Sequence, residues 1–338
     1  MSAPRLRVVI PGGTGQIGTV LARALHRMGH EVTVLSRRPR PGLPWRCEEW
    51  DGGSAGAWTR RLEGADALIN LCGRSVNCRY TAANRREILD SRTGPTRSLG
   101  EALARLENPP RVWLQASTAT IYEHTYGPPN DEFTGREGGA EPGVPAGWQF
   151  GVEVARAWEG AARAVPLPRT RLVLLRISLV MNPDPGSVFD VLLALVRRGL
   201  GGPQGNGRQF VSWIHEADLV AAVPWLMAHE EVSGPVNLAS PRPLPNAEFM
   251  AALRAAWGMR VGLPAPAWLL EAGAVFLRTE TELILKSRRV VPGVLARGGF
   301  EFRYPEWASA ARDLCRRWRL RPSGAAPARL AGETRSGR

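Results

Sequence analysis

The sequence of 338 residues predicts an α/β protein built on a doubly wound parallel sheet, with a small α-rich C-terminal region. Short apolar runs rich in β-branched residues alternate along the chain with longer segments in which apolar residues recur at helical spacing. A glycine-rich turn joins the first of these strands to the first helix. Together these observations favour parallel strands joined by crossover helices.

The first 35 residues predict a complete strand–helix–strand unit of the Rossmann type. Residues 6–10 form a short apolar run that is typical of a buried strand. Apolar residues then recur at helical spacing from Ile17 to Met28, and Gly29 follows as a natural helix end. Residues 31–35 form the second strand.

The alternation continues as far as about residue 182, after which the predicted elements become mainly helical. We expect a Rossmann-type domain over 1–181, a substrate-cleft region with the C-terminal family domain over 182–320, and a disordered tail over 321–338. Further strands are expected at 67–71, 111–116 and 171–177, helices at 81–106, 149–164 and 187–199, and a loop at 127–147. The first of these helices contains Gly94-Pro95, which can break it.

The glycine-rich turn carries the most specific chemical signal. It contains G-x-G-x-x-G directly after a strand and at the start of a helix, where a backbone without Cβ atoms can approach a pyrophosphate. The alternative is a tight turn that binds no ligand. We expect it to hold a dinucleotide through Gly12, Gly13, Thr14, Gly15, Gln16, Ile17 and Gly18.

The end of the second predicted strand favours NADP(H) over NAD(H). An acidic residue there would bind the adenosine 2′-hydroxyl, but the sequence is Leu35-Ser36-Arg37-Arg38, without a carboxylate. A serine hydroxyl and a guanidinium suit a 2′-phosphate. NAD(H) stays the alternative cofactor, because the two arginines could also be solvated residues of an arginine-rich chain.

Composition limits the function classes. The net charge is +13, and Lys286 is the only lysine among the 44 lysine and arginine residues. The charge therefore reflects a bias toward arginine, and we rank nucleic-acid binding last among the candidate functions. The chain contains no apolar run of about 18 residues and no apolar signal core, so we expect a cytoplasmic protein that neither binds nor spans a membrane. The spacing of the four cysteines fits no metal module. The expected partner is a small-molecule substrate, and homodimer formation is left open.

Several segments beyond the glycine-rich turn carry a family resemblance, and they extend from about residue 6 to 317. They include residues 67–73, 90–92, 157–159, 207–210, 213–219 and 285–293. With these segments the chain resembles the extended short-chain dehydrogenase/reductase superfamily, and within it the atypical epimerase family proteins of the YfcH type. These belong to the NAD-dependent epimerase/dehydratase superfamily and carry a C-terminal domain of unknown function.

The resemblance implies further cofactor contacts. It puts Ser36 and Arg37 near the adenosine end of the cofactor. It also puts Leu71, Cys72 and Gly73 along the groove after the 67–71 strand, and Arg92 on the following helix within reach. Relatives often carry Gly-Glu at the position where this chain has Gly73-Arg74, so one carboxylate contact is lost or reassigned.

The resemblance also exposes a missing catalytic pair. Most reductases of the superfamily use Tyr-x-x-x-Lys, but Phe150 and Val154 occupy the expected positions, and neither can transfer a proton. Thr118 takes the place of the serine that binds the substrate carbonyl. Tyr122 is the candidate replacement acid, with Arg79 or His124 to tune it; alternatively it is a packed aromatic residue whose hydroxyl is satisfied by the backbone.

Two further groups admit a functional and a structural interpretation. His215 is either a base beside Glu216 and Asp218 or, as we favour, a hydrogen-bonded structural histidine. The loop residues Asn77, Arg79 and Tyr80 either grip an anionic substrate or form a solvated loop ahead of a helix capped by Thr81. The sequence therefore predicts an NADP(H)-dependent oxidoreductase or epimerase acting on a small carbonyl or sugar-like substrate. The alternative is a cofactor-binding sensor or scaffold without turnover.

Overall fold

The computed structural model describes residues 4–139, 141–142, 144–267 and 282–321, and it contains the predicted doubly wound sheet. Seven strands pair in the order β10-β6-β5-β4-β1-β2-β3, all in parallel. The order changes direction at β1, which is where open sheets of this kind bind ligands. The strands are β1 (Arg7–Pro11), β2 (Glu31–Ser36), β3 (Arg46–Glu49), β4 (Ala67–Asn70), β5 (Val112–Thr118), β6 (Arg171–Ile177) and β10 (Gly234–Leu238).

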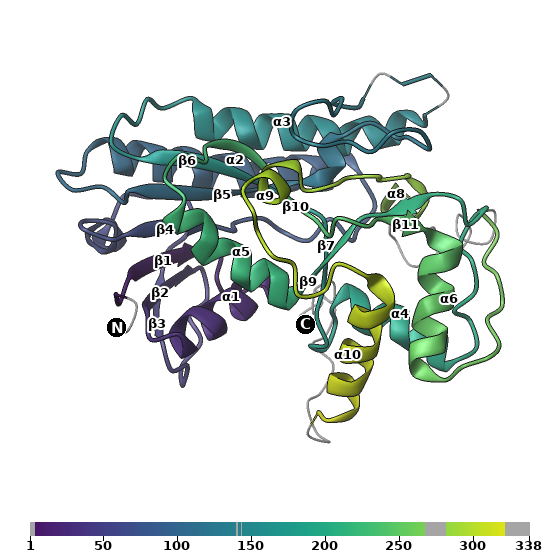
Figure 1. The fold of residues 1–338 in the computed structure, drawn as a ribbon. Coiled ribbons are helices and arrows are strands. Elements are labelled where there is room, and N and C mark those ends of the chain that lie inside the picture. Colours follow the sequence, from purple (N-terminus) through teal and green to yellow (C-terminus); the bar gives the residue numbers. More distant parts are fainter. Residues whose placement is uncertain (1–3, 140, 143, 268–281, 322–338) are drawn as a thin grey trace, which may run out of the picture.

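Helices cover both faces of this sheet (Figure 1). Helices α1 (Gln16–Arg27) and α5 (Glu216–Ala228) lie on one face, while α2 (Ala82–Ala104) and α3 (Gln149–Arg163) lie side by side on the other. Short 3-10 helices complete the layers: η1 (Ala57–Arg61), η2 (Ala119–Ile121) and η3 (Ala146–Trp148). The central strands are buried on both faces, which explains why they read as continuous apolar runs in the sequence.

The elements predicted over the first 180 residues are confirmed with small shifts of their ends. Gly29 follows α1 with φ +89°, a left-handed conformation that favours glycine after a helix end. Thr81 caps α2 by accepting a hydrogen bond from Asn84 N at 3.2 Å, as the structural interpretation of that loop requires. Helix α2 runs through Pro95 without the predicted break.

The C-terminal region packs three helices around a second apolar core, and it is α-rich as predicted. In this core Phe249 stacks on Trp307 with ring centroids 4.0 Å apart. The helices are α4 (Val188–Arg197), α6 (Asn246–Trp257) and α10 (Trp307–Arg319), and the short elements around them are β7 (Leu179–Met181), β8 (Phe210–Val211), β9 (Trp213–His215), β11 (Leu244–Pro245), α8 (Glu282–Leu285) and α9 (Gly293–Arg297). Strand β10, however, belongs to the main sheet, so the boundary expected after residue 181 cuts through that sheet.

Residues 286–291 of the C-terminal region run beside the loop that follows β5. Asn130 N donates to Arg289 O at 2.7 Å, and Val291 N donates to Asn130 O at 3.0 Å. Ser287 Oγ donates to Thr125 O at 2.6 Å. This pairing fixes the C-terminal region against the carboxyl edge of the sheet, where the predicted substrate site lies.

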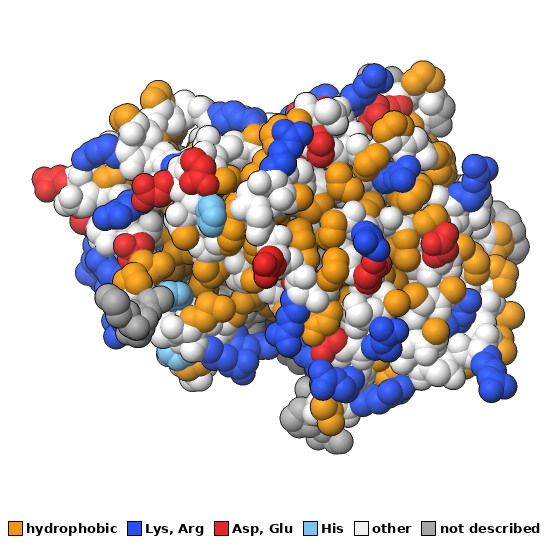
Figure 2. All heavy atoms as spheres, in the orientation of Figure 1, with side chains coloured by type: hydrophobic (Ala, Val, Ile, Leu, Met, Phe, Trp, Pro, Cys, Tyr) orange, Lys and Arg blue, Asp and Glu red, His pale blue; other side chains and the backbone are white. Residues whose placement is uncertain are grey.

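Further expectations from the sequence concern membrane spans, metal sites, the C-terminal tail and the distribution of charge. Among the described residues, no helix combines the length and apolar content needed to cross a bilayer. The same part of the chain holds no group of three or more metal-binding side chains. The predicted tail lies, apart from Arg321, outside the described residues. On the face shown in Figure 2, basic side chains are dispersed among acidic and apolar ones.

Candidate functional site

The glycine-rich loop between β1 and α1 is built so tightly that three of its glycines tolerate no side chain. Gly12 has φ +75°, and a Cβ there would lie 2.7 Å from the carbonyl of Leu71. A Cβ on Gly13 would meet Val34 Cγ2 at 2.7 Å, and one on Gly18 would meet Gly13 Cα at 2.4 Å. These glycines are therefore required for loop, strand and helix to pack together.

Gly15 differs from these three, because its only close neighbour would be Gly12 O at 3.4 Å. Gly15 is exposed and is the N-cap of α1, and no described side chain caps that helix end. The first turn also carries no acidic residue. The N–H groups and the positive end of the helix dipole are thus left to an anion, so these residues fit the pyrophosphate of a dinucleotide.

The end of β2 lies directly against this loop. The hydroxyl oxygens of Thr14 and Ser36 are 2.9 Å apart, and Arg38 N donates to Ser36 Oγ at 3.3 Å. Arg37 is exposed at the same edge. Its charge acts on the thiol of Cys72, whose pKa burial raises to about 12 against the opposing effect of Arg37. A serine, a threonine and a guanidinium thus surround the place where the adenosine end of a dinucleotide would bind.

The loop after β4 forms the other wall of the glycine-rich turn. Leu71 N donates to Pro11 O at 2.9 Å, and Cys72 N donates to Asn70 Oδ1 at 3.1 Å. Arg92 reaches this loop from α2, because a Cβ on Gly73 would lie 3.2 Å from its Cζ. Burial lowers the pKa of the Arg92 guanidinium to about 10.

Thr118 lies at the carboxyl end of β5 and is half-buried. Its Oγ1 donates to Thr120 Oγ1 at 3.1 Å and accepts from Thr120 N at 3.2 Å. The hydroxyl is therefore oriented at the edge of the sheet, in the position predicted for carbonyl binding. Its neighbour Ser117 faces inward and donates to buried Glu159 at 2.7 Å.

Tyr122 does not fit the role of an acid. It is 1% exposed, and its hydroxyl donates to Asn237 Oδ1 at 3.0 Å and accepts from Arg176 Nη1 at 3.0 Å. Burial raises the pKa of this phenol, although Arg176 opposes the change. Both hydrogen bonds are internal, so the hydroxyl cannot reach a substrate without breaking the core. The structural interpretation of Tyr122 holds, with side chains rather than backbone as its partners.

The two positions of the missing catalytic pair form an apolar patch. Phe150 and Val154 are 6% and 5% exposed, and both lie on α3. Tyr80 packs edge-on against Phe150 with ring centroids 5.0 Å apart, and Arg85 lies over the same ring at 4.8 Å. The loop residue Tyr80 thus contacts the position where the usual acid would be.

A charged cluster from the C-terminal region lies next to this patch, and the sequence reasoning missed it. Lys286 Nζ donates to Thr120 O at 3.1 Å. Glu282 lies against α3, since a Cβ on Gly151 would meet its Oε1 at 2.9 Å. Arg288 Nη2 is 3.6 Å from the same carboxylate oxygen. His124 faces the cluster, and burial lowers its pKa. The one available signal was that the only lysine of the chain lies here.

His215 is structural, as favoured from the sequence. It is fully buried, caps α5 by accepting from Ala217 N at 3.0 Å, and lies 3.3 Å from Asp313 Oδ2. Its ring stacks on Tyr304 with centroids 3.9 Å apart. Burial lowers the pKa of the imidazole to about 4, with Asp313 opposing. The histidine therefore joins α5 to α10 and lies outside the cleft.

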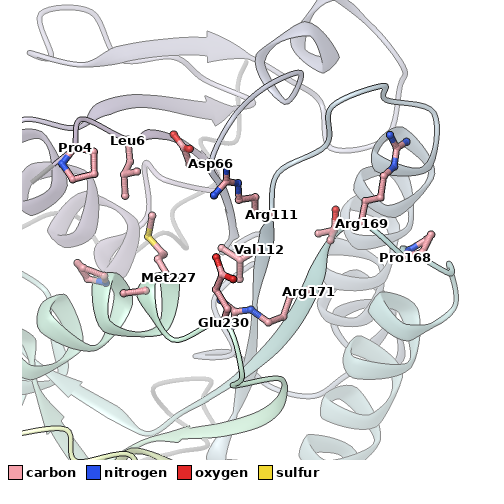
Figure 3. A pocket seen from close by; sticks show the side chains of 13 residues that line it. Pro4, Leu6, Asp66, Arg111, Val112, Pro168, Arg169, Arg171, Met227 and Glu230 are labelled. Carbon is pink, nitrogen blue, oxygen red and sulfur yellow. The ribbon is translucent and has the colours of Figure 1, made fainter.

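A cavity of about 580 Å³ lies at the opposite edge of the sheet, where β1, β4, β5 and β6 begin (Figure 3). Two of its three arginines already serve the fold: Arg171 Nη2 donates to Leu226 O at 2.8 Å, and Arg169 Nη2 donates to Leu106 O at 2.7 Å. Since dinucleotides bind at the carboxyl edge of such sheets, this cavity is not the cofactor site.

The comparisons with known proteins agree with this geometry. Residues 8–239 match the model of the NAD dependent epimerase/dehydratase family. The chain belongs to this family. Residues 265–314 match a domain of unknown function that includes the Lys286 cluster. The human epimerase family protein SDR39U1 is 32% identical over 313 residues, covering 91% of this chain and 99% of the relative. A Mycobacterium tuberculosis epimerase family protein is 33% identical over 302 residues, covering 88% and 93%.

Solved structures of the family superpose on the whole fold. The crystal structure of human SDR39U1 with NADPH matches with a TM-score of 0.80 at 32% identity, covering 92% of this chain and 99% of that one. The nucleoside-diphosphate sugar epimerase of Corynebacterium glutamicum matches with a TM-score of 0.71 at 27% identity, covering 93% of this chain and 59% of that one. The predicted family and fold class are thus confirmed.

Proposed function

We propose that this protein is an NADP(H)-dependent oxidoreductase or epimerase acting on a small carbonyl or sugar-like substrate. The observation that carries the proposal is the glycine-rich loop, in which Gly15 leaves the start of α1 open to an anion while the other glycines are packed. A loop shaped only by packing would not need a bare backbone at its exposed helix end. When bound, the nicotinamide would supply hydride transfer.

The choice of NADP(H) rests on the end of β2. Ser36 and Thr14 present neighbouring hydroxyls, Arg37 is exposed beside them, and residues 35–38 contain no carboxylate to repel a 2′-phosphate. The human relative was solved with NADPH, which supports the same choice. The residues that would hold the cofactor are Gly12, Gly13, Thr14, Gly15, Gln16, Ile17, Gly18, Ser36, Arg37, Leu71, Cys72, Gly73 and Arg92.

The substrate carbonyl would be bound at the end of β5. Thr118 Oγ1 is oriented by Thr120 and can turn toward a carbonyl oxygen, as a hydroxyl with one proton and two lone pairs allows. The apolar patch formed by Phe150 and Val154 would exclude water from the reacting carbon. Tyr122 takes no part in this step, because both of its hydrogen bonds are internal.

Turnover is tested with purified protein, NADPH and a panel of carbonyl compounds and nucleotide sugars, by following nicotinamide absorbance. The proposal predicts oxidation of NADPH with at least one carbonyl substrate, or interconversion of a nucleotide sugar. A double variant, Phe150→Tyr with Val154→Lys, restores the usual pair and is expected to raise a weak reductase activity. Cofactor binding without turnover by either protein would contradict the enzyme assignment.

A second candidate function is a cofactor-binding sensor or scaffold without turnover. It is favoured by one observation: the positions of the usual acid and its lysine are apolar and nearly buried, at 6% and 5% exposure for Phe150 and Val154. This candidate predicts that NADPH changes protease sensitivity or partner capture. Identical digestion patterns and pull-downs with and without NADPH would exclude it.

A further inference from the structure

We propose that Lys286, contributed by the C-terminal region, is the proton donor of the substrate site at the end of β5. This inference rests on the proposed reductase function and deepens it. It assigns a task to the C-terminal domain of unknown function, which is to complete the site that lacks Tyr-x-x-x-Lys.

The position of the ammonium relative to Thr118 is the first support. Lys286 Nζ donates to Thr120 O at 3.1 Å, and the Thr120 hydroxyl is 3.1 Å from Thr118 Oγ1. Among the described residues, the nearest carboxylate oxygen is Glu282 Oε1, 4.0 Å from Nζ. A buried ammonium carries three protons, and the described residues offer an acceptor within hydrogen-bonding distance for only one of them. The other two protons therefore have no hydrogen-bond acceptor among the described residues.

The second support is that the backbone holds Lys286 in place. Ser287 N donates to His124 Nδ1 at 2.9 Å, and Ser287 Oγ donates to Thr125 O at 2.6 Å. Further along, Val290 pairs with Asn130. The segment that directly follows Lys286 is therefore fastened to the loop after β5 at two points, which helps to preorganise the lysine.

The third support is the relation to the missing pair. A Cβ on Gly151 would lie 2.9 Å from Glu282 Oε1 and 2.9 Å from Thr120 Cγ2. The Glu282–Lys286 turn therefore lies over the residue that follows Phe150, which occupies the position of the usual tyrosine. The charged cluster covers the place from which the usual pair would act.

The choice of residue type is the fourth support. Lys286 is the only lysine among 44 lysine and arginine residues, in a chain that otherwise uses arginine. A guanidinium does not release a proton at neutral pH, whereas an ammonium can. Burial, together with the charge of Arg288 and against the opposing effect of Glu282 and Glu141, lowers the pKa of Lys286 to about 8. The charge of Lys286 adds to burial in lowering the pKa of His124.

The proton balance is simple. A carbonyl carbon that accepts a hydride with its electron pair leaves an anionic oxygen. That oxygen takes one proton from Nζ of Lys286, whose N–H bond breaks as the new O–H bond forms. The lysine is left as a neutral amine and regains a proton from solvent, so one NADPH and one proton are consumed for each alcohol formed.

A chain with one lysine permits a direct measurement on the unmodified protein. Growth with [13Cε]-lysine gives a single lysine resonance, whose shift is followed from pH 6 to 11 with and without saturating NADPH. We expect a pKa near 8, and a resonance that moves when NADPH binds. A pKa at the ordinary 10.5, unmoved by NADPH in a protein that calorimetry shows to bind it, would overturn the role of Lys286. Absence of any binding heat would instead overturn the proposed function.

Variants test the chemistry. With NADPH and 9,10-phenanthrenequinone as probe, Lys286→Met should lower kcat by about 100-fold or more and leave the Kd for NADPH unchanged. Lys286→Arg should not restore turnover. The wild-type rate should fall above about pH 8, where the lysine loses its proton, and the residual rate of the variants should lack this fall. Arg289→Gln, at a half-buried neighbouring residue whose Nη1 donates to Gly127 O, is the matched control and should retain wild-type turnover. Full activity of Lys286→Arg would reduce the residue to a hydrogen bond that supports Thr120. If the wild-type protein does not reduce the quinone, the pH titration of the lysine resonance alone tests the role of Lys286.

Discussion

The hydroxyl oxygens of Thr14 and Ser36 are 2.9 Å apart, and this contact joins the glycine-rich loop to the end of β2. The loop would hold the pyrophosphate of a dinucleotide, and the end of β2 would hold its adenosine ribose. A residue change at either place should therefore alter cofactor binding without disturbing the substrate side of the cleft. The predictions below start from this arrangement.

Two glycine variants should separate packing from ligand binding. Gly12→Ala places a Cβ 2.7 Å from the Leu71 carbonyl at φ +75°, so we expect a loss of at least about 1–2 kcal/mol of unfolding free energy. Gly15→Ala meets only an atom at 3.4 Å and should cost less than about 1 kcal/mol. The new methyl group of Gly15→Ala should nevertheless weaken NADPH binding. Urea unfolding and calorimetry measure both effects, and equal NADPH affinity in Gly15→Ala and wild type would contradict the phosphate site.

Arg37 should account for the preference for the 2′-phosphate. Arg37→Gln removes a charge-assisted hydrogen bond of about 1.5–3 kcal/mol, so the Kd for NADPH should rise about 10- to 100-fold. The Kd for NADH should change little, because NADH lacks the phosphate. Arg38→Gln is the matched control and should behave like wild type. If the two variants lose NADPH affinity equally, the loss reflects the lower net positive charge and not a specific contact between Arg37 and the 2′-phosphate.

Thr118 should act on turnover and not on cofactor affinity. Thr118→Val keeps the shape but removes the hydroxyl, so the loss of one hydrogen bond should lower kcat about tenfold. Thr118→Ser keeps the hydroxyl and should retain most of the activity. Both variants should bind NADPH with the wild-type Kd. Unchanged turnover in Thr118→Val would remove this residue from the site.

Tyr122 should matter for stability alone. Tyr122→Phe leaves the buried Asn237 Oδ1 without its donor, which should cost about 1–3 kcal/mol of unfolding free energy. The turnover of the folded variant should equal that of wild type. Tyr126→Phe, at a residue 44% exposed, is the control and should change neither quantity. A large loss of kcat in Tyr122→Phe at temperatures where the variant is folded would restore Tyr122 as a catalytic candidate.

The buried His215 should make the fold sensitive to mild acid. Its folded pKa of about 4 lies below the unfolded value of 6.5, so the unfolded state binds the extra proton. This contribution is present above pH 6.5 and is lost as the pH falls toward 4, by up to about 3 kcal/mol. His215→Asn keeps a helix-capping side chain without the titration. As the pH falls from 6.5 toward 4, the unfolding free energy of this variant should rise relative to that of wild type. A difference between the two proteins that stays constant over this range would contradict the assignment.

Much of the Rossmann-type half could be predicted from the sequence, because its buried strands and amphipathic helices have strong local periodicity. Strand β3 was missed, since Arg46–Glu49 is a short polar edge strand without an apolar pattern. Strand β10 was missed as part of the sheet, because its partner β6 precedes it by about 60 residues and no local signal marks that pairing.

The cofactor loop was similarly predictable, while the substrate side was not. Glycine spacing is a local signal, and it identified the tight turn in which Gly12, Gly13 and Gly18 leave no room for a side chain. The fate of Tyr122 depends on Asn237, 115 residues away, and the contact of Lys286 with Thr120 spans 166 residues. Tertiary structure alone decides such contacts. The rarity of lysine in this chain was the only hint in the sequence.

The most direct test of the central claim is calorimetric titration of the wild-type protein with NADPH and with NADH under the same buffer conditions. The geometry of the glycine-rich loop and of Ser36 and Arg37 predicts one site per chain, with NADPH bound at least about tenfold more tightly than NADH. Failure to bind either nucleotide, or a preference for NADH, would contradict the account.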